Sequence, residues 1–109
     1  GDNPTPGMSM TGTSQATIES CPPGVLGPDL RACAAYDGAV TAASTVSCPT
    51  TLILGALDRM TPRKTAQPLV DAMVGATVVE LAASGHAPMM EEPDTVRSVL
   101  GEHLVRATA

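Results

Sequence analysis

Two stretches of the chain share one pattern of apolar and polar positions. In the first, residues 50–62 (TTLILGALDRMTP), a short run of Leu and Ile ends at Gly55, and an acid follows it. In the second, residues 77–93 (TVVELAASGHAPMMEEP), a run of Val and Leu ends before a Ser-Gly break and a histidine. Short apolar runs bounded by turn residues are typical of strands covered on both faces of a parallel sheet. The pattern predicts strands at residues 52–54 and 78–81.

A helix is predicted between these two strands, beginning at Pro62 and ended by Gly75. Its apolar face consists of residues at helical spacing, namely Ala66, Leu69, Val70 and Met73. Pro68 lies inside this pattern, and an interior proline removes one backbone hydrogen bond at a cost of about 3 kcal/mol. We therefore expect either a kink at Pro68 or a helix that begins nearer residue 65.

Helices are also predicted on both sides of this central part. The last one begins at Pro93, with an apolar face of Val96, Val99, Leu100 and Leu104. Upstream, residues 14–20 form two turns, and a helix runs from Pro28 toward Ala42, weakened or ended by Gly38. Residues 1–13 are rich in Gly, Pro, Ser and Thr and are predicted as loop. The predicted order is helix, strand, helix, strand, helix, which is an α/β chain.

Composition and charge narrow the class of protein. With 109 residues and 43% hydrophobic content, the chain has the size of one small domain, filled by aliphatic side chains because Tyr36 is its only aromatic residue. A net charge of −5 with only six Lys and Arg argues against a nucleic-acid partner and an anionic membrane surface. No apolar run approaches the roughly 20 residues of a membrane span.

The termini and the cysteines give two further expectations. Cys21, Cys33 and Cys48 are odd in number and widely spaced, which fits neither a disulfide framework nor a zinc site. This usage suits a reducing compartment and predicts a cytoplasmic protein. The chain begins with Gly1 rather than Met and has no secretory signal, so we expect its start to be missing or removed.

An acid and an imidazole follow the two predicted strands, Asp58 after the first and His86 after the second. A crossover helix between the strands makes them parallel, and parallel strands end on the same edge of their sheet. Because neighbouring strands lie about 5 Å apart, we expect the two side chains to be hydrogen-bond partners. Taken alone, Asp58 is explained as a turn former and His86 as a loop residue. The two together, 28 residues apart and flanked by prolines and glycines, favour the interpretation that both are catalytic.

These residues carry a resemblance to a known family. The motifs are Cys48-Pro49-Thr50 before the strand, Gly55-x-x-Asp58-x-Met60-Thr61-Pro62 after it, and Gly85-His86-x-x-x-x-Glu91-x-Pro93. Together they resemble the C-terminal third of the α/β-hydrolase fold family, in which nucleophile, acid and histidine follow in that order. The resemblance covers residues 48 to about 104, and Asp29 to Asp37 is similar to the end of the cap or lid region.

The resemblance implies a partial cap segment at residues 1–47 and a C-terminal βαβα portion of the hydrolase core at residues 48–109. It implies a serine-type hydrolase of ester, amide or lactone-like bonds, with a small-molecule substrate and neither cofactor nor metal. His86 would be the general base, which suits an imidazole with a pKa of about 6.5. Asp58 would hold its tautomer and stabilise the imidazolium.

The chain departs from the family at the nucleophile. The expected G-x-S-x-G turn between a strand and a helix is absent from the pattern, and Gly7-Met8-Ser9-Met10-Thr11-Gly12 lacks the strand and the closing glycine. Ser9 is therefore interpreted as a loop residue, and the isolated chain as inactive. Two alternatives stay open: a non-catalytic remnant or interaction module, and a free-standing small α/β binding domain.

The remaining polar and sulfur-containing residues have plainer interpretations. His103 is expected to be structural or solvated, and Glu91 and Glu92 to complement the dipole of the following helix. The methionines near the proposed site, Met60, Met89 and Met90, either line an apolar pocket or fill the core.

Overall fold

The computed structural model describes residues 10–108, which form a mixed α/β structure with a two-stranded parallel sheet and six helices. The elements are α1 (Met10–Ser20), α2 (Leu26–Ala35), α3 (Ala39–Ala43), β1 (Thr51–Gly55), α4 (Arg63–Ala72), β2 (Thr77–Leu81), α5 (Pro88–Glu91) and α6 (Pro93–Thr108). Both predicted strands and the crossover between them are confirmed. The single turn α5 was not predicted, because four residues are too few to show a helical period.

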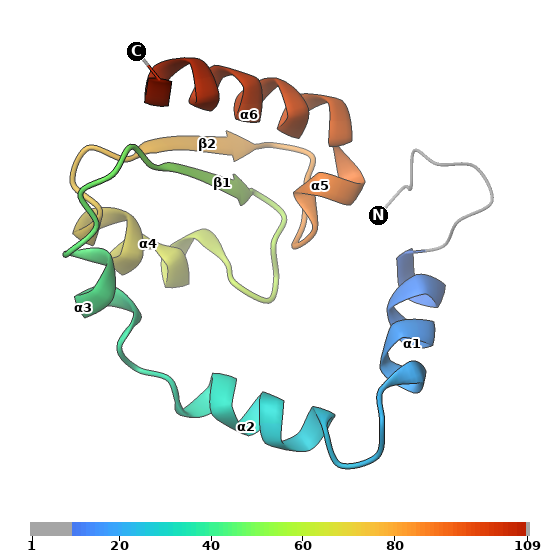
Figure 1. The fold of residues 1–109 in the computed structure, drawn as a ribbon. Coiled ribbons are helices and arrows are strands. Elements are labelled where there is room, and N and C mark those ends of the chain that lie inside the picture. The colour runs from blue at the N-terminus through green and yellow to red at the C-terminus, as the bar shows by residue number, and fades with distance from the viewer. Residues whose placement is uncertain (1–9, 109) are drawn as a thin grey trace.

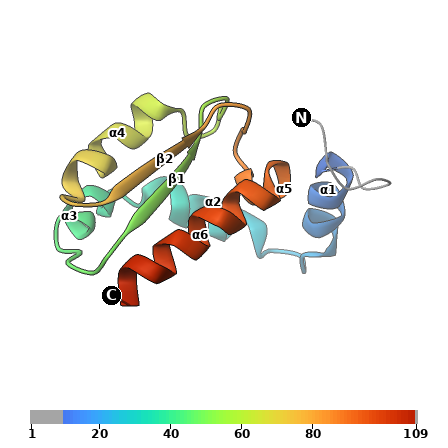
Figure 2. The same ribbon diagram turned by 90° about the horizontal axis from the view of Figure 1, so that it is seen from above.

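The sheet is built from β1 and β2 in a parallel register that runs from Thr51 opposite Thr77 to Gly55 opposite Leu81. Figures 1 and 2 show α4 and α6 on opposite sides of this sheet, with α3 beside α4 and α5 between the end of β2 and α6. Both strands point toward the same end of the unit, so the loops that follow them begin at one rim.

The helices at the N-terminal end differ from the prediction in their bounds. Helix α1 begins at Met10 rather than at Ser14, so the loop prediction is wrong for residues 10–13, and residues 1–9 lie outside the described part. Polar side chains inside α1 bond to its own backbone; Thr17 Oγ1, for example, donates to the carbonyl of Thr13 at 2.9 Å. The helix predicted over residues 28–42 is divided into α2 and α3 because Tyr36 is extended, with ψ 116°.

Helix α4 begins at Arg63 and continues through Pro68, so the alternative start near residue 65 is wrong. Proline has no N–H, and α4 therefore keeps one helical carbonyl without its usual donor. After α4, Gly75 has a φ of +88°, a left-handed conformation that favours glycine, in the connection to β2.

The buried apolar core is small. Among the described hydrophobic residues only Ala43, Leu81 and Val99 are buried. On α6 the predicted apolar face is only partly covered, since Leu100 is 50% exposed and Leu104 is 63% exposed. The sheet is too small to cover this helix, because its five-residue strands span about 17 Å whereas the sixteen residues of α6 span about 24 Å.

Helices α1 and α2 form an arm that leaves the α/β unit instead of packing on its sheet (Figure 1). No residue of α2 is buried. Cys21, Cys33 and Cys48 are free thiols. Within residues 10–108, no helix combines the length and the apolar character needed to cross a membrane.

Candidate active site at the ends of the two strands

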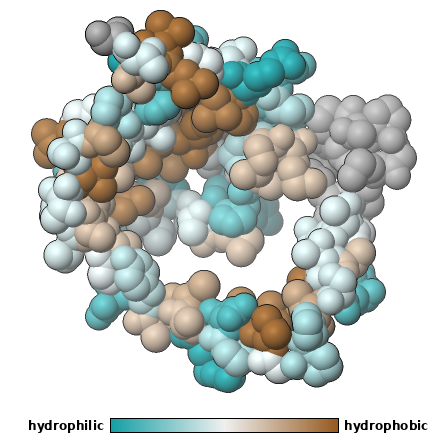
Figure 3. All heavy atoms as spheres, in the orientation of Figure 1, coloured by the Kyte–Doolittle hydropathy of each residue, from teal (hydrophilic) through white to brown (hydrophobic). Residues whose placement is uncertain are grey.

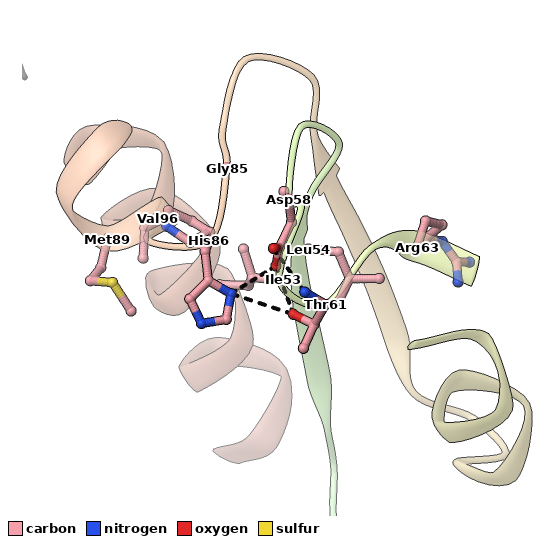
Figure 4. A pocket seen from close by; sticks show the side chains of 11 residues that line it. Ile53, Leu54, Asp58, Thr61, Arg63, Gly85, His86, Met89 and Val96 are labelled. Atoms are coloured by element: carbon pink, nitrogen blue, oxygen red, sulfur yellow. Dashed lines mark hydrogen bonds and ion pairs between the residues drawn. The ribbon is translucent and has the colours of Figure 1, made fainter. Parts of the chain in front are cut away.

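The structure brings together the two residues singled out in the sequence. Asp58 lies three residues beyond the end of β1, and His86 lies five residues beyond the end of β2. Nδ1 of His86 is 2.9 Å from Oδ2 of Asp58, which is a hydrogen-bond distance (Figure 4). The predicted contact between the two side chains is confirmed, and their catalytic role stays a prediction.

The two loops meet because glycine allows their backbones to touch. The N–H of Leu57 donates to the carbonyl of Ser84 at 2.9 Å, and the N–H of Ala56 donates to that of Leu81 at 2.9 Å. A Cβ atom at Gly55 would overlap the carbonyl oxygen of Gly85 and lie 2.6 Å from that of Ser84. Gly55 is thus required for the close approach that sets Asp58 beside His86.

The carboxylate of Asp58 is held by four donors. Oδ1 accepts from the backbone N–H groups of Met60 at 2.8 Å and of Thr61 at 3.0 Å. Oδ2 accepts from Thr61 Oγ1 at 2.7 Å and from His86 Nδ1. The hydrogen bond with His86, followed by those from Thr61, holds the pKa of Asp58 far below its usual range. Asp58 is therefore ionised at neutral pH.

This arrangement fixes the tautomer of His86. Because Oδ2 of an ionised Asp58 can only accept, Nδ1 of His86 carries the proton of their hydrogen bond. In the neutral ring Nε2 then has a free lone pair, and no described residue donates to it. In Figure 4 this second nitrogen points away from Asp58. The imidazole is 50% exposed and the carboxylate only 9%, so the base is accessible while its partner is covered.

Two glutamates hold the loop that carries His86. The Glu91 carboxylate accepts from the N–H of Gly85 at 2.6 Å and from that of Ala87 at 3.2 Å, one on each side of the histidine. Glu92 accepts from the hydroxyl of Ser84, which is fully buried, at 2.7 Å. From the sequence, Glu91 and Glu92 were expected only to complement the dipole of the following helix. In the structure they have the more specific role of holding the loop of His86. The sequence contains a signal for this role, because Glu91 follows the Gly85-His86 pair closely and the N–H groups of a loop need acceptors.

A pocket of about 270 Å³ adjoins the imidazole. It is lined by Ile53, Leu54, Gly55, Asp58, Thr61, Arg63, Gly85, His86, Pro88, Met89 and Val96. Met89 lines this pocket, as one of the two predictions for the methionines stated. The other prediction, that they fill the core, is wrong for Met60 and Met89, because their side chains are 74% and 63% exposed. His103 is structural, as expected, with Nδ1 3.0 Å from Thr51 Oγ1.

Among residues 10–108 no group of three or more His, Cys, Asp and Glu side chains is placed to hold a metal ion. Comparison with known proteins gives no relative: no family model matches this chain, and no curated protein or solved structure does.

Proposed function

We propose that this chain is the C-terminal portion of an α/β-hydrolase fold and supplies the acid and the histidine of a Ser-Asp-His triad. The observation that carries the proposal is the hydrogen bond between Asp58 and His86, which leaves Nε2 of His86 free beside an open pocket. The substrate class is a small molecule with an ester, amide or lactone-like bond. The resemblance of residues 48 to 104 to that family supports the same assignment.

In this mechanism Nε2 of His86 takes the proton of a serine hydroxyl as the serine attacks the substrate carbonyl. The imidazolium that forms is stabilised by the ionised carboxylate of Asp58, 2.9 Å from Nδ1. His86 then gives the proton to the leaving group. Thr61 contributes by donating to Oδ2, which keeps the carboxylate turned toward the ring.

The serine itself would come from outside the described residues. No serine or cysteine of residues 10–108 lines the pocket, and the one serine near the histidine loop, Ser84, is buried against Glu92. Thr61 does line the pocket, but its hydroxyl lies on the Nδ1 side of the ring, at 3.4 Å, and donates to Asp58. It is therefore placed to position the acid and not to attack a substrate.

The proposal is tested on the natural polypeptide that contains this chain together with whatever its gene encodes upstream. A fluorophosphonate probe should label one serine, and a short aryl ester should be hydrolysed. His86→Ala should lower kcat by several orders of magnitude and abolish labelling, because the general base is lost. His103→Ala is the matched control and should leave both nearly unchanged. Normal labelling and turnover in His86→Ala would refute the proposed role of His86, and a natural polypeptide that shows neither labelling nor turnover would favour a non-catalytic or interaction module.

The isolated chain provides a second test. Without the serine it should show no turnover of the aryl ester above background. Turnover that is lost in Ser9→Ala would instead place the nucleophile at Ser9, and the assignment of the serine to another segment would be wrong.

A further inference from the structure

We infer that a hollow between β1 and α6 binds a small aliphatic carboxylic acid, whose carboxylate is recognised by His103 and Arg106. This hollow lies toward the start of β1, whereas Asp58 and His86 follow the ends of the strands, and it shares only Ile53 with the pocket at His86. The inference therefore does not depend on the proposed hydrolysis, and loss of this second site leaves the roles of Asp58 and His86 unchanged.

The hollow has a volume of about 270 Å³ and lies on the face of the sheet that α6 covers (Figure 1). It is lined by Pro49, Thr50, Thr51, Ile53, Leu100 and His103. Thr51 and Ile53 are two residues apart on β1, so their side chains point to the same face. On α6, Leu100, His103 and Arg106 follow one another at intervals of three residues and lie along one side of the helix. Because Thr51 is bonded to His103, the hollow is polar at that end and apolar where Ile53 and Leu100 line it.

The hydrogen bonds of Thr51 determine which proton His103 presents. Nη2 of Arg106 is 3.3 Å from Thr51 Oγ1, and a guanidinium can only donate. The same oxygen is 3.0 Å from Nδ1 of His103, and no other described residue accepts the hydroxyl proton. This proton is therefore donated to Nδ1, and in the neutral ring Nε2 carries the N–H. His103 thus has the opposite tautomer to His86.

The Nε2–H group of His103 is a donor that has no acceptor among the described residues. The ring is half-buried and lines the hollow. Donors that are shielded from water are nearly always paired in native proteins. A ligand in the hollow that supplies an acceptor oxygen would pair this N–H.

Arg106 favours an acceptor that is negatively charged. Its guanidinium is bonded to the hydroxyl of Thr51, which lines the hollow, so a positive charge lies directly behind the polar end. The opposing carboxylate of Glu102 is 3.8 Å from Nη1 and 71% exposed, and exposed pairs of this kind interact weakly. A donor next to a positive charge suits a carboxylate, which is ionised at neutral pH and can only accept.

The apolar end of the hollow selects among anions. Leu100 is 50% exposed, and Ile53 is half-buried. An inorganic phosphate would leave these two side chains in contact with water, whereas a short branched hydrocarbon group would cover them. The two ends together therefore fit a carboxylate that is attached to a small aliphatic body.

The test uses the full chain, labelled with ¹⁵N, and follows the ring signals of both histidines at neutral pH. Without ligand, His103 should show the Nε2–H tautomer. Isovalerate should shift the ring signals of His103 in a saturable manner and leave those of His86 unchanged. Isovaleramide has the same body without the charge, and acetate has the charge without the body. Each of the two should bind at least about tenfold more weakly than isovalerate.

Two arginine variants test whether the charge acts at this site. Arg106→Gln removes the charge bonded to Thr51, and the affinity for isovalerate should fall about fivefold. Arg97→Gln is the matched control, because Arg97 is also on α6 but pairs with Asp94 at 3.1 Å and does not line the hollow. In this control the affinity should stay within about twofold of the original value.

A third variant, His103→Leu, removes the donor and should lower the affinity for isovalerate at least about tenfold. If this variant does not fold, the comparison of isovalerate with isovaleramide still decides. Equal affinities for these two compounds, or an equal loss in the two arginine variants, would overturn the inference. Phosphate or acetate that binds as tightly as isovalerate, shifts at His86 alone, or no saturable shift at His103 would overturn it as well.

Discussion

The N-terminal arm and the α/β unit are both largely regular secondary structure, but they are held in different ways. In the arm, α1 and α2 expose nearly all their side chains, and the hydrogen bonds of their polar side chains are to their own helix. In the α/β unit, segments far apart along the chain bond to one another, as Asp58 and His86 do. Figure 3 shows the same contrast, with hydrophobic residues gathered over α6 and the sheet but scattered along the arm.

This difference explains why the candidate active site lies in the α/β unit and not in the arm. A short isolated helix is marginal in water and positions nothing beyond its own turns. Two parallel strands and their loops place an acid, an imidazole and the glutamates that hold the imidazole loop within one rim. Substitutions in the α/β unit and deletion of the arm test this contrast between the two regions.

Gly55→Ala should have the largest effect on stability. The new methyl group would overlap backbone carbonyls of Ser84 and Gly85, which cannot move as a flexible side chain can. We expect a loss of about 3 kcal/mol in the free energy of unfolding, measured by urea denaturation. Gly101→Ala is the control: a Cβ there meets nothing within 4 Å, and α6 should gain up to about 1 kcal/mol. Equal effects of the two changes would contradict the close approach of the loops.

Glu91→Gln should have an intermediate effect. It leaves the backbone N–H groups of Gly85 and Ala87 with a weaker acceptor, which costs about 1–2 kcal/mol in urea denaturation. Glu102→Gln changes an exposed glutamate of α6 whose ion pair with Arg106 spans 3.8 Å, and the free energy of unfolding should stay within about 0.5 kcal/mol of the original value. Similar losses in both variants would show that Glu91 does not hold the loop.

Asp58→Asn should reveal the lowered pKa of Asp58 as a pH dependence. A carboxylate whose pKa is depressed by folding adds stability above the pKa of the unfolded state, about 3.9, and loses it as the pH falls toward the folded value. The stability difference between the original chain and Asp58→Asn should thus narrow as the pH falls below about 4. A difference that does not change below about pH 4 would mean that the carboxylate is not held as described.

Removing the arm should have the smallest effect. Deletion of residues 1–37 removes α1 and α2, in which no side chain of the described residues is buried, and should change the unfolding of the α/β unit by less than about 0.5 kcal/mol. Extending the deletion to residue 47 also removes Ala43, which is buried, and should cost about 1 kcal/mol more. A large effect of the shorter deletion would erase the distinction between the two regions.

The same contrast explains what could be predicted from the sequence. The apolar pattern of the sequence predicted the two strands and α4. It also predicted that Asp58 and His86 meet, because parallel strands end at the same edge of their sheet. The sequence did not predict the start of α1 or the division between α2 and α3. Exposed helices have no regular apolar spacing from which their ends could be located. The role of Glu91 was missed because it depends on which N–H groups the folded loop leaves unpaired.

Asp58 fixes His86 with its proton on Nδ1 and its lone pair on Nε2. The most direct measurement is the ¹⁵N spectrum of the imidazole at neutral pH, which distinguishes a protonated ring nitrogen from a bare one. We expect the Nδ1–H tautomer to predominate in the original chain and this preference to be lost in Asp58→Ala. A predominant Nε2–H tautomer, or a spectrum of His86 that does not respond to Asp58→Ala, would contradict it.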